Sequence, residues 1–207
     1  MGINNMNTMK NLVIFINVII FTGCLMSGGC NSADVNSYKT YVMDQGLVHF
    51  SLEYPANYMV DYVEYAESSS DKSRSSAIFS IMGPKDRHVN DYTDVCVVVD
   101  LPDRLMPDAK SLHERSETKA ESWKYYELIY KGEMIVDGIS AYRLDYQNID
   151  ILPALANDGD PGIEVMRRVD FDADGRVWTI YMTSPLSAAD ADKVHFEHIL
   201  ETFEILE

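Results

Sequence analysis

The chain has little positive charge. Among its 207 residues, 17 are Lys or Arg and 33 are Asp or Glu, which gives a formal net charge of −16 at pH 7. A surface of this sign repels nucleic-acid phosphates and anionic lipid headgroups. The composition therefore argues against nucleic-acid binding. It leaves neutral or basic proteins and divalent cations open as partners.

The usual sequence signatures of catalysis are missing as well. The sequence contains no "GxSxG" element, no recognisable arrangement of a nucleophilic cysteine with its histidine partner, and no glycine-rich phosphate loop. We therefore expect a binding or accessory protein rather than an enzyme. An uncharacterised hydrolase, with its site in a cleft near residues 150–162, is the alternative.

Cysteine is scarce, with three residues in the whole chain. Their spacing does not predict a disulfide framework. Cys96 lies in the apolar, strand-like run "DVCVVVD". It is expected to be an inert, buried thiol.

Long hydrophobic runs are limited to residues 12–21, "LVIFINVIIF". This run has about half of the roughly 20 residues that a helix needs to span a bilayer. Lys10 precedes it, and the small residues Thr22 and Gly23 follow it. This order is typical of a secretory signal.

The end of the signal, "FTGC", is similar to the lipobox of bacterial lipoproteins, in which a small residue precedes the cysteine that becomes lipidated. The resemblance predicts a signal peptide at 1–23, a lipid on Cys24, a flexible tether at 24–40 and a folded domain at 41–207. Cys30, in "SGGC", is the weaker lipidation candidate because it lies farther from the hydrophobic run. The expected location is the extracytoplasmic face of the cell membrane. Plain secretion and an uncleaved anchor are the other interpretations.

From residue 46 onward the pattern changes to alternation. In "LVHFSLEYP", Val48, Phe50, Leu52 and Tyr54 share one face, which predicts a half-buried strand. Three more strand candidates follow before residue 101, so an antiparallel sheet is expected. Further strands follow a helix, and the clearest are "IEVMRRVDF" and "RVWTIYMT", joined by a turn at "DADG".

Two helices are predicted between and after these strands. The first covers residues 108–125. The second begins after Pro185, with Ser187 as its N-cap and an apolar stripe that includes Ala191, Val194 and Ile199. Together the elements predict an α+β fold with a central antiparallel sheet flanked by helices.

Four segments resemble the PsbP-like family, named for an extrinsic protein of photosystem II. They are "FSLEYPANY", "DGISAYRLDY", "DGRVWTIYMTSP" and "FEHILETFEIL", in the family's order over residues 46–206. The resemblance implies a PsbP-like α/β/α sandwich and a binding or assembly role, for which an envelope protein is the expected partner. The chain lacks a recognisable photosystem-binding segment at its N-terminus, so the photosynthetic role is not carried over.

Alternate acidic residues occur in two segments, "DFDADG" (Asp170, Asp172 and Asp174) and "NDGDPG" (Asp158 and Asp160). Such spacing offers oxygen ligands to Ca²⁺, so a divalent-cation-binding module is a second alternative. In the first segment the twelfth position of a calcium loop would be Tyr181, where a bidentate Glu is needed. Ordinary turns explain both segments, and no cofactor is expected.

Arg167 is the one charged residue in register with Ile163, Val165, Val169 and Phe171. If that face is buried, the guanidinium needs a carboxylate or carbonyl partners. Two interpretations follow: a structural ion pair, or a side chain that points into a ligand cleft.

Overall fold

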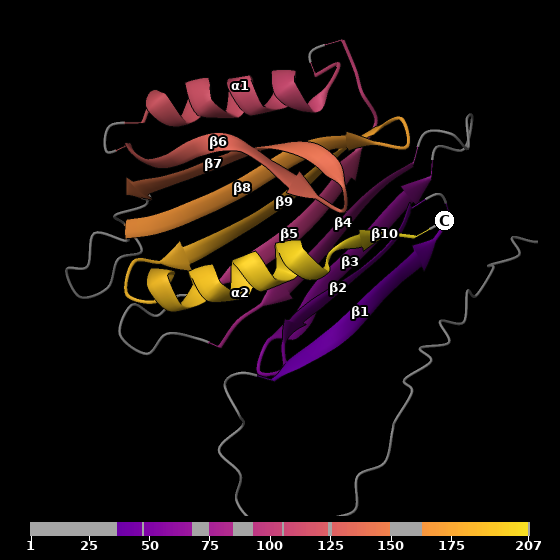
Figure 1. The fold of residues 1–207 in the computed structure, drawn as a ribbon, viewed down its shortest axis with the longest axis horizontal. Helices are drawn as coiled ribbons and strands as arrows, with labels where there is room; N and C mark the ends of the chain where they lie inside the picture. Colours follow the sequence, from indigo (N-terminus) through magenta and orange to yellow (C-terminus); the bar gives the residue numbers. More distant parts are fainter. Residues whose placement is uncertain are drawn as a thin grey trace, which may run out of the picture. The chain divides into compact units, whose positions relative to one another are not determined.

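The computed structural model describes residues 37–206, apart from 47, 68–74, 85–92, 105, 124–125 and 150–162. The described residues form two sheets and two helices (Figure 1). In chain order the elements are β1 (Tyr38–Gln45), β2 (Val48–Pro55), β3 (Met59–Glu67), β4 (Ser75–Met82), β5 (Asp94–Asp100), α1 (Ala109–Glu121), β6 (Glu127–Val136), β7 (Ile139–Ile149), β8 (Ile163–Ala173), β9 (Arg176–Pro185), α2 (Ala189–Thr202) and β10 (Glu204–Ile205).

The main sheet has seven strands in the order β3-β4-β5-β9-β8-β7-β6, and its neighbouring strands are antiparallel. A smaller antiparallel sheet has the order β1-β2-β10. The prediction of an α+β fold with a central antiparallel sheet and flanking helices is confirmed.

The two helices pack on opposite faces of the main sheet. Leu144 and Tyr146 of β7 cluster with Ala120 of α1. Arg143, which precedes Leu144 on β7, donates a hydrogen bond to Glu197 of α2. Because successive side chains of a strand point to opposite faces, α1 and α2 cover different sides of β7.

Two-residue turns join β6 to β7 and β8 to β9. Asp137 and Gly138 have φ values of 50° and 74°, and Asp174 and Gly175 have values of 51° and 70°. Positive φ at both central residues defines a hairpin turn that the dipeptide Asp-Gly favours. This turn is common in hairpins because the twist of its backbone matches the twist of the strands. The hairpin predicted from the sequence at "DADG" is confirmed.

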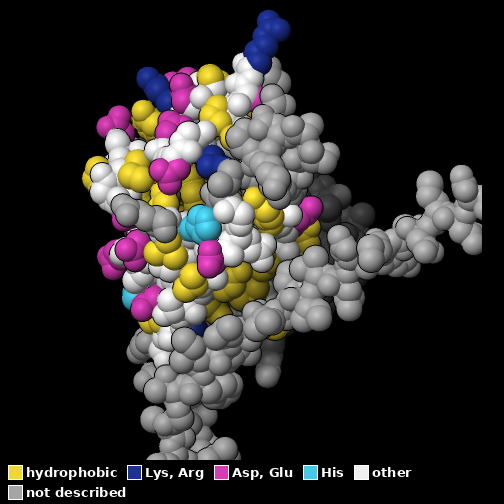
Figure 2. All heavy atoms as spheres, turned by 90° about the vertical axis from the view of Figure 1, so that its right-hand side faces the viewer, with side chains coloured by type: hydrophobic (Ala, Val, Ile, Leu, Met, Phe, Trp, Pro, Cys, Tyr) yellow, Lys and Arg dark blue, Asp and Glu magenta, His cyan; other side chains and the backbone are white. Residues whose placement is uncertain are grey.

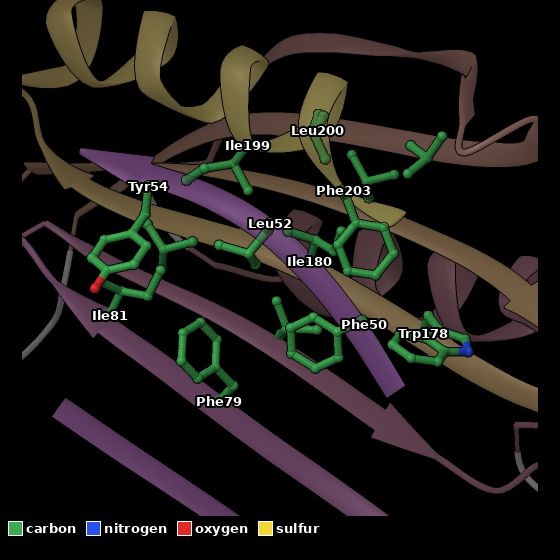
Figure 3. Packing of buried hydrophobic residues seen from close by; sticks show 14 of the residues in the cluster. Phe50, Leu52, Tyr54, Phe79, Ile81, Trp178, Ile180, Ile199, Leu200 and Phe203 are labelled. Atoms are coloured by element: carbon green, nitrogen blue, oxygen red, sulfur yellow. The ribbon is translucent and has the colours of Figure 1, made fainter. Parts of the chain in front are cut away.

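The main core lies between the two sheets and α2 (Figure 3). Val48, Phe50 and Leu52 of β2 are fully buried, as the alternation predicted. The Phe50 ring meets Trp178 edge-on, with ring centroids 5.9 Å apart, and Phe79 at the same distance. Aromatic contacts of this geometry add stability beyond the area that they bury.

The structure differs from the sequence prediction at three elements. Strand β1 was not predicted, and it takes in residues 38–40 of the segment expected to be a tether. Helix α1 ends at Glu121, before the predicted residue 125. At the start of the helix, Asp108 is the N-cap and accepts a hydrogen bond from the Ser111 amide at 2.7 Å. The third difference concerns α2.

The predicted N-cap of α2 is wrong. The helix begins at Ala189 with Ala188 as the N-cap, and the cap makes no side-chain hydrogen bond. Its buried face includes Asp192, Phe196 and Ile199, whereas Val194 is exposed. The predicted apolar stripe is therefore wrong at the start of the helix. The residue buried there is the acidic Asp192, which a search for apolar residues does not select.

Candidate functional site

A cavity with a volume of about 590 Å³ lies between α2 and the strands β6, β7 and β8. We call it the α2 cavity. The described residues of its wall include a group of charged side chains: Arg143, Asp145, Arg167, Asp190, Lys193 and Glu197. Its size is that of sites that hold small molecules or short peptide segments.

Strand alternation and register bring the charged residues of the sheet together. Arg143 and Asp145 point to the same face of β7 because they are two residues apart. In the antiparallel register, Asp145 is the cross-strand neighbour of Arg167 on β8. Helix α2 then places Glu197 and Lys193 above this part of the sheet.

Arg143 is held by two carboxylates. Its Nε and Nη2 donate to Asp145, at 2.9 Å and 2.8 Å, and its Nη1 and Nη2 donate to Glu197, at 2.9 Å and 2.7 Å. Burial alone would lower the pKa of Arg143, but the hydrogen bonds that it donates to Asp145 and Glu197 outweigh burial and raise the pKa. Arg143 is therefore permanently charged, and its bonds to both carboxylates join β7 to α2.

Arg167 has a different environment. It is 5% exposed, and its Nη2 donates to the Ala189 carbonyl at 2.9 Å. Its Nη1 is buried and has no hydrogen-bond partner, and no carboxylate forms an ion pair with it in the described part of the chain. Burial lowers the pKa of Arg167, because the charged form loses water. Of the two interpretations of Arg167, the arrangement favours the side chain facing a cleft.

The acidic residues of "DFDADG" do not converge. Asp170 is fully buried beneath α1 and accepts bonds from Arg168 Nε at 2.9 Å and from Thr179 at 2.7 Å. Asp172 accepts from the Ala109 amide at 2.9 Å, at the start of α1. Asp174 is an exposed residue of the hairpin turn.

Among the residues that the structure describes, no group of three His, Cys, Asp or Glu side chains is arranged to hold a metal ion. Asp158 and Asp160, and the lipidation candidates Cys24 and Cys30, lie outside the described residues. The sequence-based hypotheses about these four residues therefore stay predictions.

A buried polar cluster beneath α1 was not anticipated. His113 is 3% exposed, and its Nδ1 lies 3.4 Å from Asp170 Oδ2, opposite the Arg168 contact. Burial alone would raise the pKa of Asp170, but the interactions with His113, Arg168 and Thr179 lower it. The signal in the sequence was the position of His113 four residues after the buried Ala109, on the same helix face.

Cys96 is buried, as predicted, and is 5% exposed. Burial raises the pKa of its thiol to about 11, so the thiolate is scarce at neutral pH. The prediction of an inert thiol is consistent with this environment.

Exposed apolar side chains border the α2 cavity on β6. Leu128, Ile129 and Tyr130 are consecutive and 46–53% exposed, and we call them the β6 patch. Ile129 and Tyr130 also line the cavity. A different face of the molecule shows hydrophobic side chains gathered near its centre among scattered Asp and Glu (Figure 2). Contiguous apolar exposure of this kind is a feature of interaction surfaces.

The described residues form an α+β domain with a cavity beneath its C-terminal helix. No family model matches the chain, and no curated protein matches it either. Solved structures do match. LpqN of Mycobacterium tuberculosis, described as involved in cell envelope biogenesis, has a TM-score of 0.50 at 13% identity, over 83% of this chain and 93% of LpqN.

Two further structures give similar coverage. Cyanobacterial PsbP (CyanoP) from Synechocystis has a TM-score of 0.49 at 16% identity, over 86% of this chain and 98% of CyanoP. The yeast Ran-binding protein Mog1p, from Saccharomyces cerevisiae, has a TM-score of 0.47 at 11% identity, over 83% of this chain and 96% of Mog1p. At these identities the likeness is one of fold alone.

Proposed function

We propose that the protein is a lipid-anchored extracytoplasmic binding module, a non-catalytic accessory or assembly factor for an envelope protein. The observation that carries the proposal is the α2 cavity with the β6 patch at its border. The described residues that line this cavity include no Ser, Thr, Cys or His. The described wall offers charged and apolar contacts for binding, and it holds no pair of a hydroxyl or thiol nucleophile with a His base.

The sequence and one structural likeness support the proposed location. The segment "FTGC" supplies the lipidation signal, with Cys24 as the modified residue. In the described residues, no helix is long and apolar enough to cross a membrane. The likeness to LpqN, a protein of cell envelope biogenesis, is in keeping with a role at the envelope.

The first experiment is a crosslinking pull-down of the full chain from cells that produce it. The test variant is Leu186→Glu, because Leu186 is exposed and lines the cavity. The matched control is Val194→Glu, which adds the same charge at an exposed apolar residue that is not among the lining residues. We expect one envelope protein to be recovered with the wild type and the control, and to be lost with Leu186→Glu.

Recovery of the same proteins with Leu186→Glu as with the wild type would count against partner binding at the cavity. The anchor is tested separately by comparing membrane and soluble fractions of the wild type and Cys24→Ser. Metabolic labelling with a fatty acid should mark the wild type alone. A Cys24→Ser protein that carries as much label as the wild type would rule out lipidation at this residue.

A further inference from the structure

We infer that the α2 cavity recognises a carboxylate attached to an apolar body, and that Arg167 is the residue that binds the carboxylate. The inference rests on the proposed function and adds the chemistry of the group that the partner presents. In the proposed setting, that group is a terminal or side-chain carboxylate of the partner protein.

The first argument is the unmet hydrogen-bonding capacity of Arg167. A guanidinium has five N–H donors in a planar fork that matches the two oxygens of a carboxylate. The only bond of Arg167 among the described residues goes to the Ala189 carbonyl, and its Nη1 is buried without a partner. An unpaired, buried cationic donor is costly, and a bound carboxylate would remove that cost.

The second argument concerns the carboxylates of the cavity itself. Asp145 and Glu197 would otherwise neutralise Arg167, but both are bound to Arg143. Asp190 is exposed, and Lys193, three residues later on α2, lies on the same helix side. Lys193 also lines the cavity, but Arg167 is the buried cation, and its Nη1 has no partner among the described residues.

The third argument is the position of the first turn of α2. Ala189 and Asp190 line the cavity, and the N-cap Ala188 makes no side-chain capping bond. The amide end of a helix carries a partial positive charge that favours anions. Together with the unpartnered guanidinium, this partial charge attracts an anion, and the carboxylates of Asp190 and Asp192 in the same turn oppose it.

The apolar part of the ligand is inferred from the rest of the wall. Ile129, Val165 and Leu186 line the cavity, and the β6 patch continues this surface outward. A carboxylate held at Arg167 would therefore have an apolar chain beside it. The volume of about 590 Å³ accommodates a few residues of a peptide or one small molecule.

The test measures binding to the full chain with two pairs of probes. Acetyl-leucyl-leucine with a free carboxylate is compared with its amide, and hexanoate is compared with hexanamide. We expect each carboxylate to bind about tenfold to a hundredfold more tightly than its amide, the range for a charge-assisted bond. Tighter binding of the peptide acid than of hexanoate supports a protein source, whereas the reverse order indicates a small-molecule carboxylate.

Arg167→Met removes the charge and keeps most of the side-chain length, and it should abolish the preference for carboxylates. Arg167→Lys should retain part of it. The matched control is Arg115→Met, an exposed arginine of α1, which should leave binding unchanged. If Arg167→Met does not fold, the comparison of acids with amides on the wild type still decides the question.

Equal binding of the acids and the amides would overturn the inference. So would an Arg167→Met protein that folds and keeps the preference. If the pull-down still recovers the envelope partner with Arg167→Met and loses it with Leu186→Glu, the inference fails while the proposed function stands. If neither variant changes the pull-down, the proposed function itself fails.

Discussion

Replacement of Arg143 by Met should destabilise the protein by about 3 kcal/mol or more. Asp145 is 4% exposed, and Arg143 supplies the direct hydrogen bonds to its carboxylate. Removal of one partner from a buried ion pair leaves an uncompensated charge and typically costs about 3–5 kcal/mol. The second partner, Glu197, has a side chain that is 35% exposed, so its loss adds at most about 1 kcal/mol.

The neighbouring Arg167 sets the lower end of this range. It faces Asp145 across the strands, and its guanidinium has an unused donor. In the Arg143→Met variant, Arg167 can turn toward Asp145 and recover part of the lost interaction. For this reason we expect a value near 3 kcal/mol rather than 5 kcal/mol.

The assay is urea unfolding followed by tryptophan fluorescence, to which Trp178, 1% exposed in the core, contributes a buried reporter. Arg115→Met is the control and should change the free energy of unfolding by no more than about 0.5 kcal/mol. The double variant Arg143→Met/Asp145→Leu removes both buried charges and should recover to within about 1–2 kcal/mol of the wild type. A single variant that loses less than about 1 kcal/mol, or a double variant no more stable than the single one, would refute the reasoning.

Three further predictions concern other parts of the domain. Tyr58→Phe removes a buried hydrogen bond of 2.8 Å to Asp192 and should cost about 2 kcal/mol in urea unfolding; a loss below about 0.5 kcal/mol would contradict it. Burial lowers the pKa of His195 below its ordinary value of 6.5, so the unfolded chain binds more protons than the folded one and stability should fall as the pH drops through 6.5. The His195→Gln variant should show a weaker dependence of the melting temperature on pH in this range. An unchanged dependence would refute the prediction. Gly175→Ala, at φ 70°, should cost about 1 kcal/mol, against no more than about 0.5 kcal/mol for the exposed control Ser140→Ala; equal effects would count against a strained turn.

The sequence predicts a strand or helix well where one face is buried and the other is exposed to solvent. The alternation of β2 has this form, and its buried residues Val48, Phe50 and Leu52 were all identified. The Asp-Gly turns were also predictable, because few dipeptides adopt left-handed geometry at both positions. Strand β1 was missed because Met43 is its one residue in the buried class, and its extended form depends on pairing with β2.

The polar face of β7 was harder to interpret from the sequence. Tyr142, Leu144 and Tyr146 alternate with Arg143 and Asp145, a pattern that usually separates a buried face from a solvated one. In this fold both faces are covered, one by α1 and the other by α2. The contacts that bury the polar face come from Glu197, more than 50 residues away, so no local pattern could indicate them.

The two arginines of the cavity differ in their hydrogen-bond partners, and this difference assigns a structural role to one and a binding role to the other. Arg143 and Arg167 lie on adjacent strands and on the same face of the sheet, and both are more than nine-tenths buried. Arg143 has two carboxylates, and Arg167 has one carbonyl. Asp145, which faces Arg167 across the strands, is already bonded to Arg143. Arg143 is therefore neutralised by two carboxylates, whereas Arg167 can still bind an anion. Loss of Arg143 should therefore reduce the free energy of unfolding, whereas loss of Arg167 should reduce affinity for carboxylates.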